Sequence, residues 1–266
     1  MKIGIVGRGV VGNALAYGLK RGHEIVSYDK FKEGYQNLRD VVKTEIIFFC
    51  LPTPMNINGE IDLTPLEALI DKVVTLSKKD RKTLVIKSTA VSGTTKTFAD
   101  KYPNHDFAFC PEFLTDRNAN EDFINTTRII IGTNDVNVFD RLSNVFKQAH
   151  FTCPILFTDF TTAEFIKYFS NILLACKVTL ANEMYAIAQK LGINYDIAKE
   201  ILLMDRRFGQ SHLEVPGNDG DKGFGGRCLP KDLNAFIHLA KQYGYNAEFL
   251  KAVWDNNLKW RNKKDW

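Results

Sequence analysis

Short apolar runs separated by helical patterns fill the first 158 residues, and this alternation constrains the fold more than any other feature. Most runs are apolar at every position rather than at every second one, as in strands covered on both faces. The predicted strands lie at residues 2–6, 24–29, 45–51, 83–88, 107–110, 128–132 and 155–158, and the clearest helical patterns between them lie at 10–21, 65–78 and 135–149. This alternation predicts an α/β fold with a Rossmann-type, doubly wound parallel sheet.

The strand signal stops near residue 159, and the remaining patterns are helical. Residues 161–191 contain neither glycine nor proline and predict one long helix that ends before Gly192. Shorter helical patterns follow at 195–204, 230–243 and 247–261, with a glycine-rich loop at 217–226. We therefore predict two domains: residues 1–158 form the Rossmann-type domain, and residues 159–266 form the long connecting helix and a small all-helical domain.

The composition is that of an ordinary globular protein, with 45% hydrophobic and 25% charged residues among 266. The net charge of +4 is small and the basic runs at 78–82 and 259–266 are isolated, so we predict no nucleic-acid partner. Five cysteines, an odd number within apolar runs, favour reduced thiols in the cytoplasm over a disulfide framework. We expect no metal site, and no run of 18 apolar residues predicts a membrane span.

A glycine motif of the form G-x-G-x-x-G follows the first predicted strand and opens the first predicted helix. It comprises Gly7, Gly9, Val10, Val11 and Gly12. Glycines at this spacing allow a tight turn and a close approach of the backbone to a pyrophosphate at a helix N-terminus. Asp29, at the end of the second strand, would bind ribose hydroxyls and repel a 2′-phosphate, which favours NAD over NADP. Lys30 and Lys32 leave NADP open, and the glycines could also serve a tight turn alone.

The stretch GFGGRCLPKD at residues 223–232 places Cys228 between three glycines and a proline. Pro230 marks the first turn of a helix, so Cys228 lies just before a helix N-terminus. The partial positive charge there, with Lys231 nearby, favours a thiolate. Asp232 could cap that helix or accept a proton. The residues alone leave two interpretations open, a reactive cysteine and a structural one.

Lys167 and Asn171 lie four residues apart on the long predicted helix, and hence on one face. Much of this helix is apolar, so the lysine must either extend to water or find a partner, because an unpaired buried ammonium group is costly. Together, the two side chains could instead form a cationic donor site for an oxyanion.

Taken in order, these and further motifs resemble the nucleotide-sugar 6-dehydrogenases, the family of UDP-glucose and GDP-mannose dehydrogenases. The matching stretches are GRGVVG at 7–12, LPTP at 51–54, GEIDLTPLEA at 59–68, KSTAVSGTT at 87–95, PEFL at 111–114, EFIKYFSN at 164–171, RFG at 207–209 and GFGGRCLPKD at 223–232. They span almost the whole chain, and the cysteine motif is the most specific of them. By this resemblance, the first domain is the NAD-binding one and the second carries the catalytic cysteine loop.

The resemblance implies a cytoplasmic, NAD-dependent oxidoreductase of polysaccharide biosynthesis. It would oxidise the C6 alcohol of a nucleotide sugar, UDP-glucose before others, to the carboxylate in two steps. Cys228 would capture the intermediate aldehyde as a thiohemiacetal, and the second oxidation would give a thioester that water cleaves. Lys167 and Asn171 would stabilise the oxyanion. Asp232 and Thr89 would position water and accept protons, and Glu112 would be the general base in thioester hydrolysis.

The resemblance also assigns binding roles. To the glycine motif and Asp29 it adds the cofactor residues Thr53, Thr89 and Lys231, and for the substrate it gives Glu112, Phe113, Leu114, Lys167, Asn171, Arg207, Phe224, Gly225 and Cys228. Simpler interpretations stay open from the residues alone. These are a solvated carboxylate for Glu112, a helix cap for Thr89, a turn residue for Thr53, core positions for Phe113 and Leu114, and a surface arginine for Arg207.

Three features depart from the family pattern. The family usually carries a third, C-terminal domain that holds part of the nucleotide, whereas this sequence stops at Trp266. We therefore expect weaker nucleotide binding, or a partner chain that supplies the missing contacts. Val91 stands where the family commonly has a proline, and TDRNANEDF at 115–123 replaces the usual substrate-side loop. The second replacement leaves the base and the sugar undetermined.

The long helix at 161–191 predicts a homodimer, because an apolar helix needs a cover that a second copy can supply. Other functions stay open: a non-catalytic protein that binds NAD or a nucleotide sugar, or a dehydrogenase of GDP-mannose or of a UDP-N-acetylhexosamine. A β-hydroxyacid dehydrogenase would share the architecture. That class performs one oxidation and uses no loop cysteine, so the GFGGRC stretch argues against it.

Overall fold

The computed structural model describes residues 1–56 and 58–266, which divide into two compact units. The first unit comprises Met1–Pro54 and Asp62–Lys167, and the second comprises Met55–Ile61 and Tyr168–Trp266. The division falls inside the long helix, and an isolated antiparallel bridge between Met55 and Ile61 belongs to the second unit. The assignment of separate functions to residues 1–158 and 159–266 stays a prediction.

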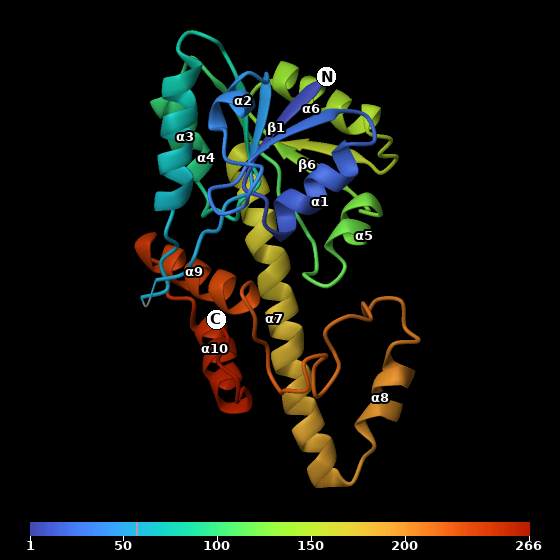
Figure 1. The fold of residues 1–266 in the computed structure, drawn as a ribbon. Coiled ribbons are helices and arrows are strands. Elements are labelled where there is room, and N and C mark those ends of the chain that lie inside the picture. Colours follow the sequence, from blue (N-terminus) through green and yellow to red (C-terminus); the bar gives the residue numbers. More distant parts are fainter. Residues whose placement is uncertain (57) are drawn as a thin grey trace. The chain divides into compact units, whose positions relative to one another are not determined.

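The first unit is built on a seven-stranded sheet in the order β2-β1-β3-β4-β5-β6-β7 (Figure 1). The strands are β1 (Lys2–Val6), β2 (Glu24–Tyr28), β3 (Ile46–Phe49), β4 (Thr83–Ile86), β5 (Asp106–Phe109), β6 (Ile129–Gly132) and β7 (Ile155–Thr158). Neighbours are parallel except β5 and β6, which meet in an antiparallel pair between their last residues, Phe109 and Gly132. The predicted Rossmann-type sheet is confirmed, but it is not parallel throughout, because an apolar run carries no information on strand direction.

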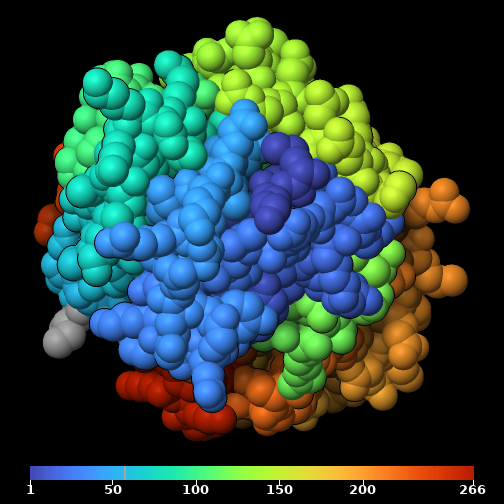
Figure 2. Space-filling view, turned by 45° about the horizontal axis from the view of Figure 1, so that its top comes forward, coloured from blue at the N-terminus to red at the C-terminus, as the bar shows by residue number. Residues whose placement is uncertain are grey.

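Both faces of the sheet are buried, which is why its strands lack an alternating pattern. Successive side chains of β3 enter different cores: Ile46 and Phe48 lie in one, and Ile47 and Phe49 lie in the other. The first face is covered by α1 (Val10–Leu19), α5 (Ala119–Ile124) and α6 (Val136–Gln148), and the second by α2 (Leu38–Val42), α3 (Thr64–Ser77), α4 (Thr94–Lys101) and the start of α7 (Phe160–Leu191). In Figure 2 the first residues of the chain, in dark blue, reach the surface between α3, in teal, and α6, in yellow-green.

The long helix α7 begins directly after β7, at the end of the sheet where β6 also ends. A Cβ on Gly132 would lie 2.4 Å from the Ala163 Cβ and 2.8 Å from the Asp159 carbonyl oxygen. The missing side chain therefore lets the first turn of α7 pack against the end of β6. The predicted helix at 161–191 is confirmed, with one further residue at its start.

The second unit contains the rest of α7 and three further helices, α8 (Tyr195–Leu202), α9 (Leu229–Gln242) and α10 (Glu248–Trp260). Buried amides hold the glycine-rich loop that precedes α9. Asn182 Oδ1 accepts from the Gly223 N–H at 3.2 Å, and Asn257 Oδ1 accepts from the Phe224 N–H at 2.7 Å. Asn257 Nδ2 also donates to the Phe224 carbonyl at 2.9 Å. The loop is therefore anchored to α7 and α10 just before it reaches Cys228.

Candidate active site

The glycine motif lies between β1 and α1 in a conformation that requires two of its glycines. Gly7 has a φ of +94°, and a Cβ on Gly12 would lie 1.9 Å from the Gly7 carbonyl oxygen. Gly9 immediately precedes α1, and a Cβ there would meet no described atom within 4 Å. Val10 and Val11 form the first turn of the helix. Open space beside the N-terminus of α1 is where a pyrophosphate approaches the backbone, so the loop fits a dinucleotide.

Asp29 follows β2 and lies beside this loop. Its carboxylate accepts hydrogen bonds from the backbone N–H of Arg8 at 2.7 Å and from that of Phe31 at 2.9 Å. The Gly7 N–H also donates to the Tyr28 carbonyl at 2.8 Å, which joins the loop to the end of β2. The position matches that of the acidic residue that binds ribose hydroxyls in a Rossmann-type site.

Two further predicted cofactor residues lie in the loops that follow β3 and β4. The Thr53 hydroxyl donates to the Thr89 carbonyl at 2.8 Å, so the two loops contact each other. Thr89 does not cap α4, because the N-cap residue of that helix is Gly93. Since β3 and β4 are parallel to β1, these loops share an edge of the sheet with the glycine motif, where Rossmann-type folds bind their ligands.

Glu112 and Lys167 form a buried ion pair in the first unit. Lys167 Nζ lies 2.8 Å from Glu112 Oε1 and donates to the Glu112 carbonyl at 2.7 Å. The Lys167 side chain is 5% exposed and the Glu112 side chain is 10% exposed. The Leu114 N–H donates to Glu112 Oε2 at 2.8 Å. Lys167 therefore has the partner that its apolar surroundings demand, and Glu112 is not a solvated carboxylate.

The protonation of Glu112 is set by two opposing effects. Burial raises its pKa, but the charge of Lys167 and the hydrogen bonds from Lys167 and Leu114 outweigh burial, so the pKa lies below its usual value. Glu112 is therefore a carboxylate at neutral pH and has the charge that a proton acceptor needs.

Phe113 and Leu114 are half-buried rather than core residues. The Phe113 ring lies 5.6 Å from Lys167 Nζ and 4.4 Å from the Arg128 guanidinium carbon. The predicted contact of their backbone with the substrate stays a prediction.

Cys228 is the N-cap residue of α9, and it is exposed. Pro230 stands in the first turn of the helix, as the sequence predicted. The Asp232 N–H donates to the Cys228 carbonyl at 2.9 Å, which fixes the backbone of the cysteine at the helix start.

Asp232 lies in the first turn of α9 and is fully buried. Its carboxylate accepts from Asn171 Nδ2 at 2.5 Å and from Lys231 Nζ at 2.6 Å. The structure therefore brings together Asn171, Lys231, Asp232 and Cys228 within the second unit. Burial of Asp232, and its bond to Asn171 across 61 residues, could not be read from the sequence.

The remaining predicted substrate residues have different surroundings. Phe224 is buried, with its ring 6.3 Å from that of Trp254. A Cβ on Gly225 would lie 2.1 Å from Arg261 Nη2. The absence of a side chain at Gly225 therefore leaves room for the Arg261 guanidinium group. Arg207 is a surface arginine in this structure: its side chain is 82% exposed and pairs with Asp205 at 2.5 Å.

Sequence reasoning missed Lys87, which lies just after β4. It is 3% exposed and donates to the carbonyl oxygens of Cys110 and Pro111, both at 3.1 Å. Lys87 therefore holds the backbone that leads into Glu112. The signal was a single lysine directly after the apolar run LVI at 84–86.

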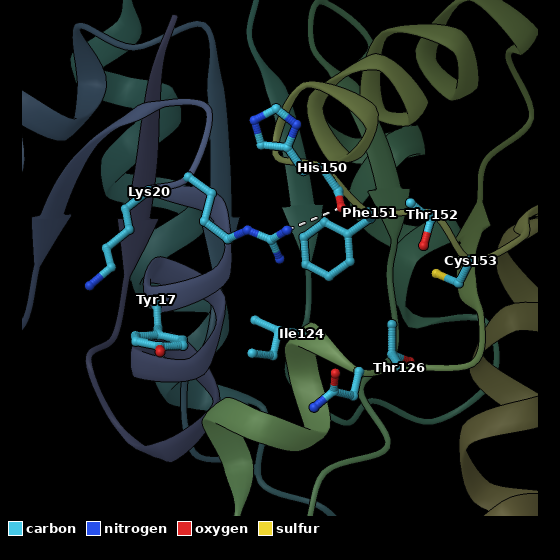
Figure 3. A pocket seen from close by; sticks show the side chains of 10 residues that line it. Tyr17, Lys20, Ile124, Thr126, His150, Phe151, Thr152 and Cys153 are labelled. Carbon is cyan, nitrogen blue, oxygen red and sulfur yellow. Dashed lines mark hydrogen bonds between the residues drawn. The ribbon is translucent and has the colours of Figure 1, made fainter.

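A pocket of about 750 Å³ opens at the other end of α1, away from the glycine motif (Figure 3). Its walls include Tyr17, Lys20, Ile124, His150 and Phe151. α1, α5 and α6 all end here, and cations near helix C-termini offset the negative ends of the helix dipoles. The basic side chains of this pocket are therefore explained by the helix ends, and its residues are not those of the predicted site.

None of the helices formed by the described residues has the length and apolar composition needed to cross a membrane. Within residues 1–56 and 58–266, no group of three or more histidine, cysteine, aspartate or glutamate side chains is placed to hold a metal ion.

A Rossmann-type sheet, a glycine loop open to a pyrophosphate and an aspartate after β2 define the first unit as a dinucleotide-binding fold. Residues 31–150 match the NAD binding domain, and residues 161–259 match the central domain, of the UDP-glucose/GDP-mannose dehydrogenase family. The chain belongs to this family, as its motifs predicted, and its cofactor is NAD.

Relatives of known sequence and structure cover most of this chain. A UDP-glucose 6-dehydrogenase of Rickettsia bellii (strain RML369-C) is 33% identical over 233 residues, which are 86% of this chain and 52% of the relative. A GDP-mannose 6-dehydrogenase of Azotobacter vinelandii is 30% identical over 261 residues, which are 93% of this chain and 57% of the relative. The structure of a UDP-glucose dehydrogenase from Pyrobaculum islandicum matches with a TM-score of 0.84 and 27% identity, over 97% of this chain and 68% of that one. The chain spans about half the length of these two sequence relatives.

A 3-hydroxyisobutyrate dehydrogenase of Mycobacterium tuberculosis shares the fold, with a TM-score of 0.77 at 16% identity over 97% of this chain and 92% of that one. At this identity the likeness shows the fold alone. The fold therefore does not distinguish a nucleotide-sugar dehydrogenase from a hydroxyacid dehydrogenase. The match to the central domain of the nucleotide-sugar dehydrogenases distinguishes them, because it includes the cysteine loop at 223–232.

We expect Gly9→Ala to fold with the wild-type melting temperature but to bind NADH about tenfold more weakly or worse, because the added methyl group occupies the space through which the pyrophosphate approaches. Fluorescence titration with NADH measures the affinity. The control is Gly209→Ala in the second unit, where the nearest neighbour of an added Cβ is Lys177 Nζ at 3.6 Å; it should change neither property. Wild-type NADH affinity in Gly9→Ala would contradict this placement of the pyrophosphate.

We expect Glu112→Gln to lower the free energy of unfolding by about 3 kcal/mol at pH 7, because it leaves the Lys167 ammonium buried without a counter-charge. The folded-state pKa of Glu112 is depressed, so the stabilisation is complete above its ordinary pKa of 4.5 and is lost as the pH falls through the lower folded value. Urea denaturation between pH 3 and pH 7 should show the gap between wild type and variant narrowing only at the acid end. Glu121→Gln, at an exposed position, is the control; a gap independent of pH would contradict the ion pair.

Proposed function

We propose that this chain catalyses the NAD-dependent, two-step oxidation of the C6 alcohol of a nucleotide sugar to the uronate, with UDP-glucose as the first substrate to test. The observation that carries the proposal is the exposed Cys228 at the start of α9, next to a buried carboxylate held by an amide and an ammonium group. Its relatives include both a UDP-glucose 6-dehydrogenase and a GDP-mannose 6-dehydrogenase. We propose residues 1–158 as the NAD-binding domain and residues 159–266 as the domain with the cysteine loop.

Cys228 would supply the nucleophile. Its place at a helix N-terminus favours the thiolate, because the partial positive charge there stabilises an anion. The sulfur would add to the aldehyde carbon of the first oxidation product and give a thiohemiacetal, whose oxidation leaves a thioester that water cleaves. NAD, when bound, supplies the hydride acceptor for both oxidations.

Three side chains near Cys228 would transfer protons and stabilise the negative charge that develops on the substrate: Asp232, Asn171 and Lys231. The buried Asp232 carboxylate holds Asn171 and Lys231 in place through hydrogen bonds of 2.5 and 2.6 Å. A donor that is already oriented costs no reorganisation when negative charge develops on the substrate oxygen, which suits Asn171 to an oxyanion role.

Glu112 and Lys167 would complete the acid–base set. The ion pair keeps Glu112 ionised, as a base for thioester hydrolysis must be, and the Glu112 contacts hold the Lys167 ammonium in one position. The depressed pKa makes Glu112 a weak base, so its value to the reaction lies in position more than in basicity.

We expect the purified chain to form two NADH for each nucleotide sugar consumed, because the alcohol and then the aldehyde are oxidised. NADH absorbance, followed with each of a panel of UDP- and GDP-sugars that includes a UDP-N-acetylhexosamine, identifies the substrate. Cys228→Ser should abolish uronate formation while NADH binding persists, and the half-buried Cys153→Ser is the matched control. One NADH per sugar, or full activity in Cys228→Ser, would contradict the thioester route. NADH binding with no turnover of any sugar would favour the non-catalytic alternative, or a partner chain that completes the nucleotide site.

We further propose a cytoplasmic homodimer with a role in polysaccharide synthesis, in which a second copy covers α7. Within the second unit this helix exposes a row of large apolar side chains. They are Leu173, Leu180, Met184, Ile187 and Leu191, with exposed fractions between 45% and 67%. Their spacings of seven, four, three and four residues follow one side of a helix, and such a row is typical of helix–helix interfaces.

We expect the wild-type chain to sediment as a dimer and Leu180→Glu to sediment as a monomer, because a charge in the middle of an apolar interface is costly. Analytical ultracentrifugation measures the mass, and circular dichroism confirms that the variant folds. Gln189→Glu adds the same charge at an exposed position on the opposite side of the helix, nine residues from Leu180, and should stay dimeric. A monomeric wild type would exclude the homodimer.

A further inference from the structure

Arg261, the residue that follows α10, is buried in the second unit, with its side chain 1% exposed. Each of its three guanidinium nitrogens has a partner of its own. Nη1 lies 2.6 Å from Asp219 Oδ2, Nη2 donates to both oxygens of Asp265 at 3.2 Å, and Nε donates to the Lys263 carbonyl at 2.8 Å. A lysine has a single nitrogen and could not bind these three groups at once.

The partners of Arg261 connect the two ends of the glycine-rich loop at 217–226. Asp219 lies near the beginning of this loop. Asp265 binds its end, because Asp265 Oδ1 accepts the Gly226 N–H at 2.8 Å. That hydrogen bond and the charge of Arg261 hold the pKa of Asp265 below its usual range, so the carboxyl group is ionised at neutral pH. Arg261 therefore joins the beginning of the loop to its end.

Two glycines at the end of the loop are needed for different reasons. A Cβ on Gly225 would lie 2.1 Å from Arg261 Nη2 and 2.4 Å from Asp265 Oδ1, so Gly225 makes room for the ion pair. A Cβ on Gly226 would meet no described atom within 4 Å, but its φ of +73° favours glycine. Cys228, the N-cap residue of α9, follows directly after this turn and Arg227.

We infer that Arg261 is a positioning residue for the proposed oxidation: it closes the loop at 217–226 and thereby fixes the place of the Cys228 sulfur. A glycine-rich backbone has many accessible conformations, so contacts with other segments must select one of them. A displacement of a reacting group by about 1 Å can cost about a hundredfold in rate. The inference rests on the proposed function for its effect on turnover, whereas closure of the loop can be measured without any substrate.

The first test measures amide hydrogen exchange in the full chain by mass spectrometry. In Arg261→Ala, peptides that cover residues 217–228 should exchange at least about tenfold faster than in wild type, because the loop opens locally. Peptides from α7 should exchange as in wild type, which separates local opening from unfolding of the unit. Arg261→Lys should resemble Arg261→Ala, because charge alone does not join three partners. Lys264→Ala removes the same charge at an exposed position of the same segment and should leave the exchange unchanged.

The second test compares steady-state kinetics with NADH binding. Arg261→Ala should lower kcat by about tenfold or more, while KM for the nucleotide sugar and Kd for NADH change by less than about threefold. A loss of folded protein would instead lower kcat and the number of NADH sites together. Melting temperatures identify a variant that fails to fold, and Asp265→Asn, which keeps the size of the side chain but loses the charge facing Arg261, then replaces Arg261→Ala.

Two results would overturn the inference: unchanged exchange at 217–228 in Arg261→Ala, or faster exchange with the kcat of wild type. A wild-type chain that binds NADH but oxidises no sugar would contradict the proposed oxidation. In that case faster exchange in Arg261→Ala would still support closure of the loop by Arg261, and unchanged exchange would still overturn it.

Discussion

The structure depends on one requirement: each polar side chain that α7 buries must find a partner, because an unpaired buried charge or amide is costly. Glu164, Lys167 and Asn171 are 0%, 4% and 8% exposed. The first binds the N-terminus of α4, the second a carboxylate after β5, and the third an aspartate in the first turn of α9. Each partner lies at the start or end of an element of the same unit, so α7 fixes two segments of the first unit through Glu164 and Lys167 and one segment of the second unit through Asn171.

Two buried glutamates in the first unit show how a partner decides protonation. Burial raises the pKa of Glu164 to about 7, although the N–H groups of Gly93 and Thr95 and the Thr95 hydroxyl donate to it. Burial acts in the same direction on Glu112, but the positive charge of Lys167 outweighs it and lowers the pKa. With neutral hydrogen-bond donors alone, a buried carboxyl group is therefore partly protonated and partly ionised near neutral pH. One ammonium group keeps it fully ionised.

Elements that depend on a local sequence pattern could be predicted from the sequence. All seven strands and the longer helices follow from apolar runs and from the glycine and proline residues that end them. The helices α2, α4 and α5 were not predicted. The start of α4 is held by Glu164, which is 69 residues away from its partner Thr95, and such a contact leaves no local pattern. The glycine motif gave the dinucleotide loop. The partners of Lys167 and Asp232 could not be predicted, because both are distant in sequence and pairing is a property of the packed chain.

The five cysteines differ in how readily an oxidant could reach them. Cys50 and Cys110 are buried, and burial raises the pKa of both thiols, to about 12 for Cys50. Cys153 and Cys176 are half-buried, and only Cys228 is exposed. Peroxide attacks thiolates that solvent can reach, and its first product is a sulfenic acid that a reductant restores. The exposure that would let Cys228 meet a sugar aldehyde therefore also makes it the position where oxidative damage begins.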